Sequence, residues 1–241
     1  MALKALRGQP TRFVTIISAD HFSEAPARFQ KFFCLVKKEA LRYPDQLFLA
    51  GSLPESFPTK SHSKFGWISV KKAIGARSNS VKSFAEKPSG VRLNRIRKNG
   101  GLINSGMFFG QLETFNRAYE ELFPNALDKQ FRHSQLPKIP IDKVIFEKFK
   151  KVRCVPLRER WVDLGSWSEL ARQGMGDEST TVEGRGNFFW STEKMQAFFF
   201  GVKDLAVVKV GSRIMIVPLS KAESRVLDRS RGRGSNYLER S

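Results

Sequence analysis

The order of strand, helix and strand between residues 13 and 50 narrows the fold of this chain more than any other feature. Residues 13–17 are a β-branched apolar run, which predicts a buried strand. Residues 29–41 repeat apolar side chains at helical spacing, and residues 47–50 are apolar again. A helix that joins two strands in this way favours a parallel α/β sheet, because parallel neighbours need a crossover connection.

The remainder of the chain divides into an α/β part and a part made of strands. We expect an α/β domain over residues 1–175, a small all-β appendage over residues 181–227 and a disordered basic tail over residues 228–241. Ser23 or Glu24 is expected to cap the first helix, residues 174–181 predict a linker, and no internal repeat is evident. Further strands are predicted at residues 66–70, 80–85, 103–110, 152–157, 188–190, 197–200, 206–210 and 214–217, and further helices at residues 91–98, 112–122, 141–149 and 168–172.

The charge of the chain is strongly positive. Lys and Arg number 42 against 23 Asp and Glu, which gives a formal net charge of +19. An excess of this size attracts nucleic acid, anionic lipid or phosphorylated substrates. The basic residues are spread along the whole chain, however, and most phenylalanines lie in core-like runs rather than among them. A nucleic-acid partner is therefore not the favoured interpretation.

The sequence offers no sign of a membrane or of secretion. No apolar run approaches the roughly 20 residues of a membrane span, and the N-terminus lacks a signal-peptide pattern. Cys34 and Cys154 are too few for a disulfide framework, and their apolar surroundings predict buried thiols. We expect no membrane partner and a cytoplasmic location.

Two acidic residues follow predicted strands and are candidate metal ligands. Asp20 comes after residues 13–17, and Asp163 lies in Asp163-Leu164-Gly165-Ser166-Trp167, between a strand and a helix. Either residue alone fits a helix cap or a turn. Both together lie where open α/β sheets bind ligands, beyond the carboxyl ends of strands. Two carboxylates placed there could share one divalent cation and serve phosphate chemistry.

A second group of residues has the chemistry of sugar recognition. The carboxylate of Glu86 could accept hydrogen bonds from sugar hydroxyls, and the ammonium of Lys87 could meet a phosphate. Because a proline follows at position 88, both residues are expected in an extended segment. Asn104 supplies an amide beside a glycine. The alternatives are a surface ion pair at Glu86 and Lys87 and a turn at Asn104.

The histidines do not suggest a further centre. His21, His62 and His133 lack the spacing of metal ligands, and His62 and His133 are expected in exposed loops. No Ser/His/Asp or Cys/His arrangement is apparent.

Six motifs in this order resemble the mannose-1-phosphate guanylyltransferases, a branch of the sugar-nucleotide pyrophosphorylases. The resemblance extends from about residue 7 to residue 227, with a further similar segment at residues 202–208. The six are Ser18-Ala19-Asp20-His21, Phe65-Gly66-Trp67-Ile68, Phe84-Ala85-Glu86-Lys87-Pro88, Asn104-Ser105-Gly106-Met107-Phe108, Ile141-Asp142-Lys143-Val144-Ile145-Phe146-Glu147-Lys148 and Trp161-Val162-Asp163-Leu164-Gly165-Ser166-Trp167.

The resemblance implies a Rossmann-like nucleotidyltransferase domain that joins GTP and mannose 1-phosphate into GDP-mannose and pyrophosphate. Catalysis would rest on positioning and on charge neutralisation by Mg²⁺ or Mn²⁺. By this resemblance Asp20 and Asp163 hold the metal ion and Glu86 and Asn104 bind mannose hydroxyls. Gly66 lets the backbone approach the sugar. Lys87 is expected near the phosphate.

The sequence also departs from the family. It contains no Gly-Gly-x-Gly-x-Arg loop of the kind that cradles the GTP phosphates, and it begins just before the strand that carries Asp20. We therefore expect an N-terminally truncated domain, which lacks on the order of 100 residues. Residues 13–17 would then form an exposed sheet edge, which favours instability, a homodimer or a complementing N-terminal fragment. Lys64, Phe65 and Ile103 are smaller departures.

Three functions remain open from the sequence. The chain could be a guanylyltransferase, active alone or with its N-terminal half supplied by another chain. It could be a non-catalytic relative that binds sugar phosphate or a partner. It could also be a basic nucleic-acid-binding protein, which would show strongly salt-dependent binding.

Overall fold

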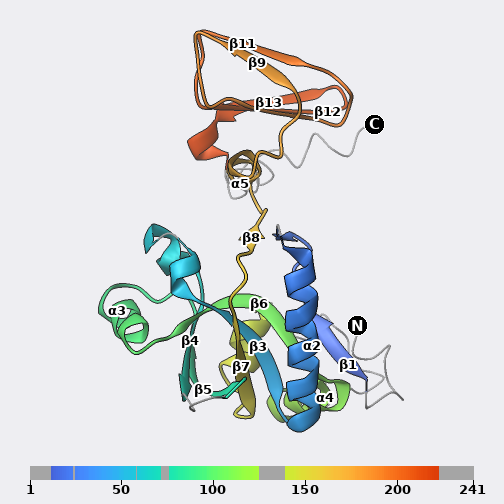
Figure 1. Cartoon of the computed structure of the whole chain (residues 1–241), viewed down its shortest axis with the longest axis vertical. Coiled ribbons are helices and arrows are strands. Elements are labelled where there is room, and N and C mark those ends of the chain that lie inside the picture. The colour runs from blue at the N-terminus through green and yellow to red at the C-terminus, as the bar shows by residue number, and fades with distance from the viewer. Residues whose placement is uncertain (1–11, 24, 58, 72–75, 125–138, 223–241) are drawn as a thin grey trace. The chain divides into compact units, whose positions relative to one another are not determined.

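The computed structural model describes residues 12–23, 25–57, 59–71, 76–124 and 139–222 (Figure 1). Of these, residues 12–19 and 23–161 belong to one compact unit, and residues 20–22 and 162–222 belong to a second. None of the helices in these ranges combines the length and the apolar character that a membrane crossing requires. The predicted tail at 228–241 lies outside the described residues.

A mixed sheet lies at the centre of the first unit, and within the described ranges it has six strands in the order β1-β6-β3-β7-β5-β4 (Figure 1). These strands are β1 (Phe13–Ile16), β3 (Leu47–Ser52), β4 (Trp67–Lys71), β5 (Asn79–Ala85), β6 (Leu102–Gln111) and β7 (Val152–Leu157).

Strand β6 pairs antiparallel with β1, β3 and β4, whereas β3 and β7 are parallel. The expected α/β fold is confirmed, but the expectation of a parallel sheet is only partly right: β1 and β3 run in the same direction with β6 between them. Because β4 also pairs with β5, and β5 with β7, the strands β6, β3, β7, β5 and β4 form a closed ring of pairings.

Strand β1 lies at the edge of this sheet and pairs only with β6 among the described strands. The strand predicted at residues 13–17 is present, but the prediction that it is buried is wrong. β1 is half-buried, and Ile17 beyond it is 51% exposed. An edge strand has a neighbour on one side only, so its side chains receive less cover than those of a central strand.

Helices cover both faces of the sheet. α2 packs on the face that buries Phe48 and Ala50, whereas α4 and η4 pack on the face that buries Leu47 and Leu49. All four of these β3 side chains are fully buried, as the two-residue alternation of a strand between two apolar layers requires. The elements around the sheet are α2 (Pro26–Arg42), α3 (Gly90–Lys98), α4 (Leu112–Leu122), the π-helix η4 (Asp142–Phe146) and the 3₁₀ turns η1 (Pro54–Ser56) and η2 (Thr59–Lys64).

Two helices differ from the sequence predictions. Helix α2 begins with Pro26 after an Ala25 cap that makes no side-chain bond, so the expected cap at Ser23 is wrong, and Glu24 lies outside the described residues. The Ser23 hydroxyl instead accepts a hydrogen bond from the Ala25 N–H. The helix predicted at residues 141–149 is reduced to the single π-turn η4.

The second unit is a small β structure preceded by a helix. Paired residues of its parallel strands keep a constant offset of 18 positions (197 against 179, 203 against 185, 206 against 188). The chain therefore makes one coil of 18 residues and stacks the next coil on it. This unit contains β2 (His21–Phe22), β8 (Val162–Asp163), α5 (Trp167–Arg172), β9 (Ser179–Val182), β10 (Phe188–Ser191), β11 (Ala197–Phe200), β12 (Leu205–Val210), β13 (Arg213–Pro218) and the turn η5 (Leu219–Lys221).

This coil corrects two predictions. The chain has an internal structural repeat, and the end of the expected linker at residues 174–181 belongs to strand β9. The repeat is hidden in the sequence because stacked positions carry different side chains, such as Phe188 on Ala206. Elsewhere, Cys154 is buried as expected, but Cys34 is exposed. His62 is buried rather than exposed, and His133 lies outside the described residues.

A buried polar network fastens the β4–β5 hairpin to the rest of the first unit. The Ser78 hydroxyl donates to the carboxylate of Glu39 on α2, and it accepts from Nε of Arg153 on β7 at 2.8 Å. Nη2 of Arg153 also donates to the Ser78 carbonyl at 2.7 Å. Glu39 is 4% exposed and Ser78 is fully buried. The Ser78 hydroxyl therefore links the buried carboxyl group of Glu39 to the guanidinium group of Arg153 through two hydrogen bonds.

Ser78→Ala should lower the free energy of unfolding by about 2 kcal/mol, because the buried carboxyl group of Glu39 would lose its hydrogen-bond donor. Urea denaturation measures this change. Ser83→Ala, at an exposed position of β5, is the matched control and should change stability by less than about 0.5 kcal/mol. Equal effects of the two substitutions would contradict the role given to this network.

Candidate functional site

The two predicted metal ligands meet in the second unit, where β2 pairs with β8. His21 lies opposite Asp163 in this antiparallel pair, and the Leu164 N–H donates to the Asp20 carbonyl at 2.9 Å. Oδ1 of Asp163 accepts the Gly165 N–H at 2.9 Å. A side chain at position 165 would place its Cβ only 2.9 Å from that oxygen, so the glycine keeps the tight turn possible. Ser166 then caps α5 by accepting the Glu169 N–H.

The charges of Asp20 and Asp163 act on each other. Burial, and next the charge of Asp20, raises the pKa of Asp163, while the Gly165 N–H opposes this change. Burial lowers the pKa of His21, and the two carboxylates oppose that shift. Two carboxylates that repel each other at one position are a suitable pair of oxygen ligands for a hard divalent cation.

Asp20 and Asp163 supply two carboxylates that could hold a metal ion. Among the described residues, no group of three or more His, Cys, Asp or Glu side chains could hold a metal ion. Mg²⁺ is commonly bound by one or two carboxylates, with water and substrate phosphates as its other ligands. Asp20 and Asp163 fit that pattern.

The predicted sugar-binding residues come together in the first unit. Gly66, just before β4, accepts the Asn104 N–H at 2.8 Å, which sets the two residues side by side. A Cβ on Gly66 would lie 2.9 Å from Oε2 of Glu86 and 3.4 Å from the Cβ of Asn104. A side chain at position 66 would thus fill the space beside both polar groups, which explains the glycine.

The two polar groups offer complementary hydrogen bonds. Oδ1 of Asn104 accepts the Gly106 N–H at 3.1 Å, which leaves the amide NH₂ as the donor. The Glu86 carboxylate can only accept when ionised. A hydroxyl beside Gly66 could therefore donate to Glu86 and accept from Asn104.

Lys87 departs from its predicted conformation. Its φ is +44°, in the left-handed region, so the expectation of an extended residue before Pro88 is wrong. Its Nζ lies 3.6 Å from Oε1 of Glu86, and its side chain is 52% exposed. The ammonium thus balances Glu86 and can still reach an anion in solvent.

Asp142 is a neighbour of this cluster to which the sequence alone assigned no role. Burial, and next the charge of Asp142, raises the pKa of Glu86, while Lys87 and Lys143 oppose the change. The only signal in the sequence was the motif Ile141 to Lys148, which carried no indication of its distance from Glu86.

Glu86→Gln tests the burial of this carboxylate. Because the folded-state pKa of Glu86 is raised, its contribution to stability is present below the unfolded pKa and lost as pH rises through the folded pKa. The substitution should therefore raise stability at neutral pH, by less than about 1 kcal/mol, and flatten the fall in stability that sets in as pH rises above the unfolded pKa of about 4.3.

Urea midpoints at pH values below and above this pKa measure the effect of Glu86→Gln. Glu120→Gln, at an exposed position of α4, is the control and should leave the profile unchanged. A wild-type profile in Glu86→Gln would show that Glu86 is not the carboxylate with the raised pKa.

Comparisons with known proteins agree with this fold. The nucleotidyl transferase family matches residues 1–180. A mannose-1-phosphate guanylyltransferase of Salmonella muenchen is 24% identical over 187 residues, which cover 66% of this chain and 39% of that protein. The alginate biosynthesis protein AlgA of Pseudomonas aeruginosa is 26% identical over 243 aligned positions, which cover 89% of this chain and 49% of AlgA. The chain thus spans half or less of the length of these relatives.

A solved structure has the same fold over most of the chain. It is described as a mannose-1-phosphate geranyltransferase from Thermus thermophilus, with a TM-score of 0.73 and 22% identity. The match covers 94% of this chain and 72% of that one. The expected resemblance to the mannose-1-phosphate guanylyltransferases is confirmed, and because the family match covers well over half of its length, the chain belongs to the nucleotidyl transferase family.

Proposed function

We propose that this chain takes part in the transfer of a guanylyl group from GTP to mannose 1-phosphate, for which it supplies the residues that hold the sugar phosphate and the metal ion. The observation that carries the proposal is the pairing of β2 with β8, which brings Asp20 and Asp163 together from distant parts of the sequence. The cluster of Gly66, Glu86 and Asn104 supports it with a donor and an acceptor for sugar hydroxyls.

In the proposed reaction a phosphate oxygen of mannose 1-phosphate attacks the α-phosphorus of GTP. A new P–O bond forms, the bond to the β-phosphate breaks, and pyrophosphate leaves with its electron pair. Glu86 and Asn104 would fix the sugar ring and so orient the attacking oxygen. Lys87 would attract the phosphate group. A Mg²⁺ ion held by Asp20 and Asp163 would supply charge neutralisation for the phosphates.

The 241 residues contain no Gly-Gly-x-Gly-x-Arg sequence, so activity should be tested both without and with a source of such a loop. Pyrophosphate release from GTP and mannose 1-phosphate should be measured with this chain alone and with an added polypeptide that carries such a loop. Turnover in either mixture, lost in Asp163→Asn, supports the proposal. A chain that binds mannose 1-phosphate but gives no turnover in either mixture would be a non-catalytic sugar-phosphate-binding relative.

Asn104→Ala should weaken the binding of mannose 1-phosphate about tenfold, because it removes one hydrogen-bond donor to the sugar. Isothermal titration calorimetry of the full chain measures the affinity. Asn94→Ala, at an exposed position of α3, is the control and should bind as the wild type does. Equal affinity in Asn104→Ala and the wild type would remove Asn104 from the sugar site.

The wild-type chain should bind Mg²⁺, and Asp163→Asn should weaken that binding about tenfold, because one of two carboxylate ligands is lost. Calorimetric titration of each variant with MgCl₂ makes the comparison. Asp45→Asn is the control, since Asp45 forms an exposed ion pair with Lys151. Mg²⁺ binding that is unchanged in Asp163→Asn would contradict the metal site.

A further inference from the structure

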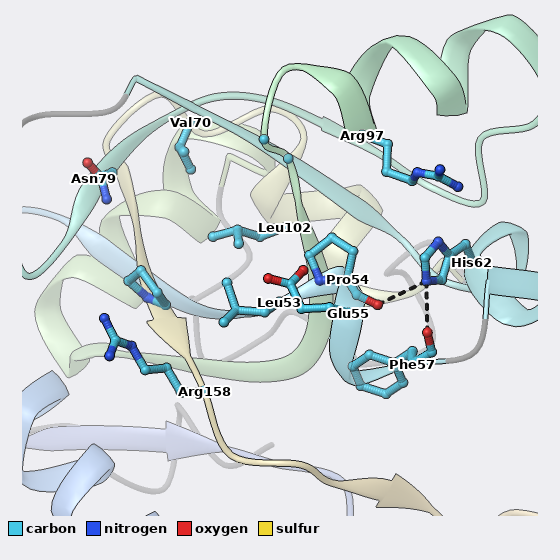
Figure 2. A pocket seen from close by; sticks show the side chains of 13 residues that line it. Leu53, Pro54, Glu55, Phe57, His62, Val70, Asn79, Arg97, Leu102 and Arg158 are labelled. Carbon is cyan, nitrogen blue, oxygen red and sulfur yellow. Dashed lines mark hydrogen bonds between the residues drawn. The ribbon is translucent and has the colours of Figure 1, made fainter.

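A cavity of about 860 Å³ lies in the first unit. Its volume falls within the range of small-molecule sites. Leu53, Val70 and Leu102 give it an apolar surface, and none of the six residues proposed for the metal ion and the sugar phosphate lines it. In Figure 2, Arg158 and Asn79 lie on one side of the cavity and Arg97 and His62 on the other.

A buried histidine holds the loop that carries the acidic group of the cavity. Nε2 of His62 lies 3.0 Å from the Pro54 carbonyl and 3.2 Å from the Phe57 carbonyl. Since carbonyls only accept, Nε2 carries the hydrogen in this arrangement. The two carbonyls flank Glu55 in the sequence, so these hydrogen bonds hold the backbone on both sides of the exposed Glu55. The Trp67 indole N–H donates to the His62 carbonyl at 2.9 Å and anchors the histidine in turn.

The charges along the cavity alternate. Glu55 lies between the two arginines in Figure 2. Within the part of the chain that the structure describes, the side chains of Glu55, Arg97 and Arg158 form no ion pair with each other or with another residue. An anionic ligand group would be repelled by Glu55 and attracted to an arginine, so it must lie toward one end of the cavity. The carboxylate of Glu55 then remains free to accept hydrogen bonds from a neutral part of the same ligand.

We propose that this cavity binds a nucleoside monophosphate whose base presents N–H donors. The phosphate would lie at Arg158, on the side of the cavity where Figure 2 also shows Asn79, because His62 on the side of Arg97 already donates to the Pro54 and Phe57 carbonyls. The base would lie on Leu53 and Leu102 and donate to Glu55. Guanine, with two adjacent N–H donors, matches a carboxylate better than adenine does.

This inference does not depend on the proposed guanylyl transfer, because the two sets of residues are separate. Asn104→Ala should leave nucleotide binding in the cavity unchanged. Likewise, substitutions in the cavity should leave the affinity for mannose 1-phosphate unchanged. The failure of one proposal is therefore visible without the other.

Calorimetric titration of the full chain with guanosine 5′-monophosphate, guanosine and adenosine 5′-monophosphate tests the inference. We expect the monophosphate to bind about tenfold more tightly than guanosine, and Arg158→Gln to remove that difference. Glu55→Gln should weaken the binding of guanosine 5′-monophosphate about tenfold. The variant should then bind guanosine 5′-monophosphate and adenosine 5′-monophosphate with equal affinity. Thermal unfolding of each variant verifies that it is folded.

Arg97→Gln and Arg92→Gln are the matched controls, and each should change the affinity less than about twofold. If Arg97→Gln weakens binding as much as Arg158→Gln, the general positive charge of the chain attracts the nucleotide and the proposal fails. Tighter binding in Glu55→Gln would show that Glu55 only repels the phosphate, which also overturns it. No binding of guanosine 5′-monophosphate at millimolar concentration excludes the site.

Discussion

The hydrogen bonds of strand β6 are the constraint on which the first unit depends. This strand pairs with β1 and β4 along one edge, at different ends, and with β3 along the other. The register with β4 brings Asn104 beside Gly66. The register with β3 lets the buried Ser105 hydroxyl donate to the Ala50 carbonyl at 2.9 Å. A shift of β6 by one residue would turn Asn104 away from Gly66 and expose its apolar neighbours, so the fold and the candidate sugar site share one register.

Much of this fold could be predicted from apolar periodicity. Helix α4 and strand β7 have the predicted bounds, because each is a strongly patterned segment with a clear end, such as Pro124 after the helix. Tertiary pairing was harder to foresee. The ring of strands closes through only two residue pairs between β5 and β7. The 18-residue coil of the second unit stacks residues of different types on one another. Neither feature leaves a periodic signal in one sequence.

In the candidate site, too, the identity of the residues could be predicted from local sequence, but their spatial arrangement could not. Gly66, Glu86 and Asn104 could be chosen by residue type and motif, but their mutual distances depend on the pairing of β4 with β6. The rule for residues before proline failed at Lys87, where the turn after β5 imposes a positive φ. His62 was expected in an exposed loop but is buried, and Asp142 was given no role. The role of each depends on a neighbour distant in the sequence or on a turn that no local pattern predicts.

We propose that Asp20 and Asp163 hold a metal ion and that Glu86 and Asn104 hold a sugar phosphate. A crystal structure of the chain with mannose 1-phosphate and Mg²⁺ would show both groups of residues with their ligands. We expect sugar hydroxyls within hydrogen-bond distance of Glu86 and Asn104, and a metal ion ligated by Asp20 and Asp163 at about 2.1 Å. A sugar phosphate bound elsewhere, or a metal ion that contacts neither acid, would contradict this proposal.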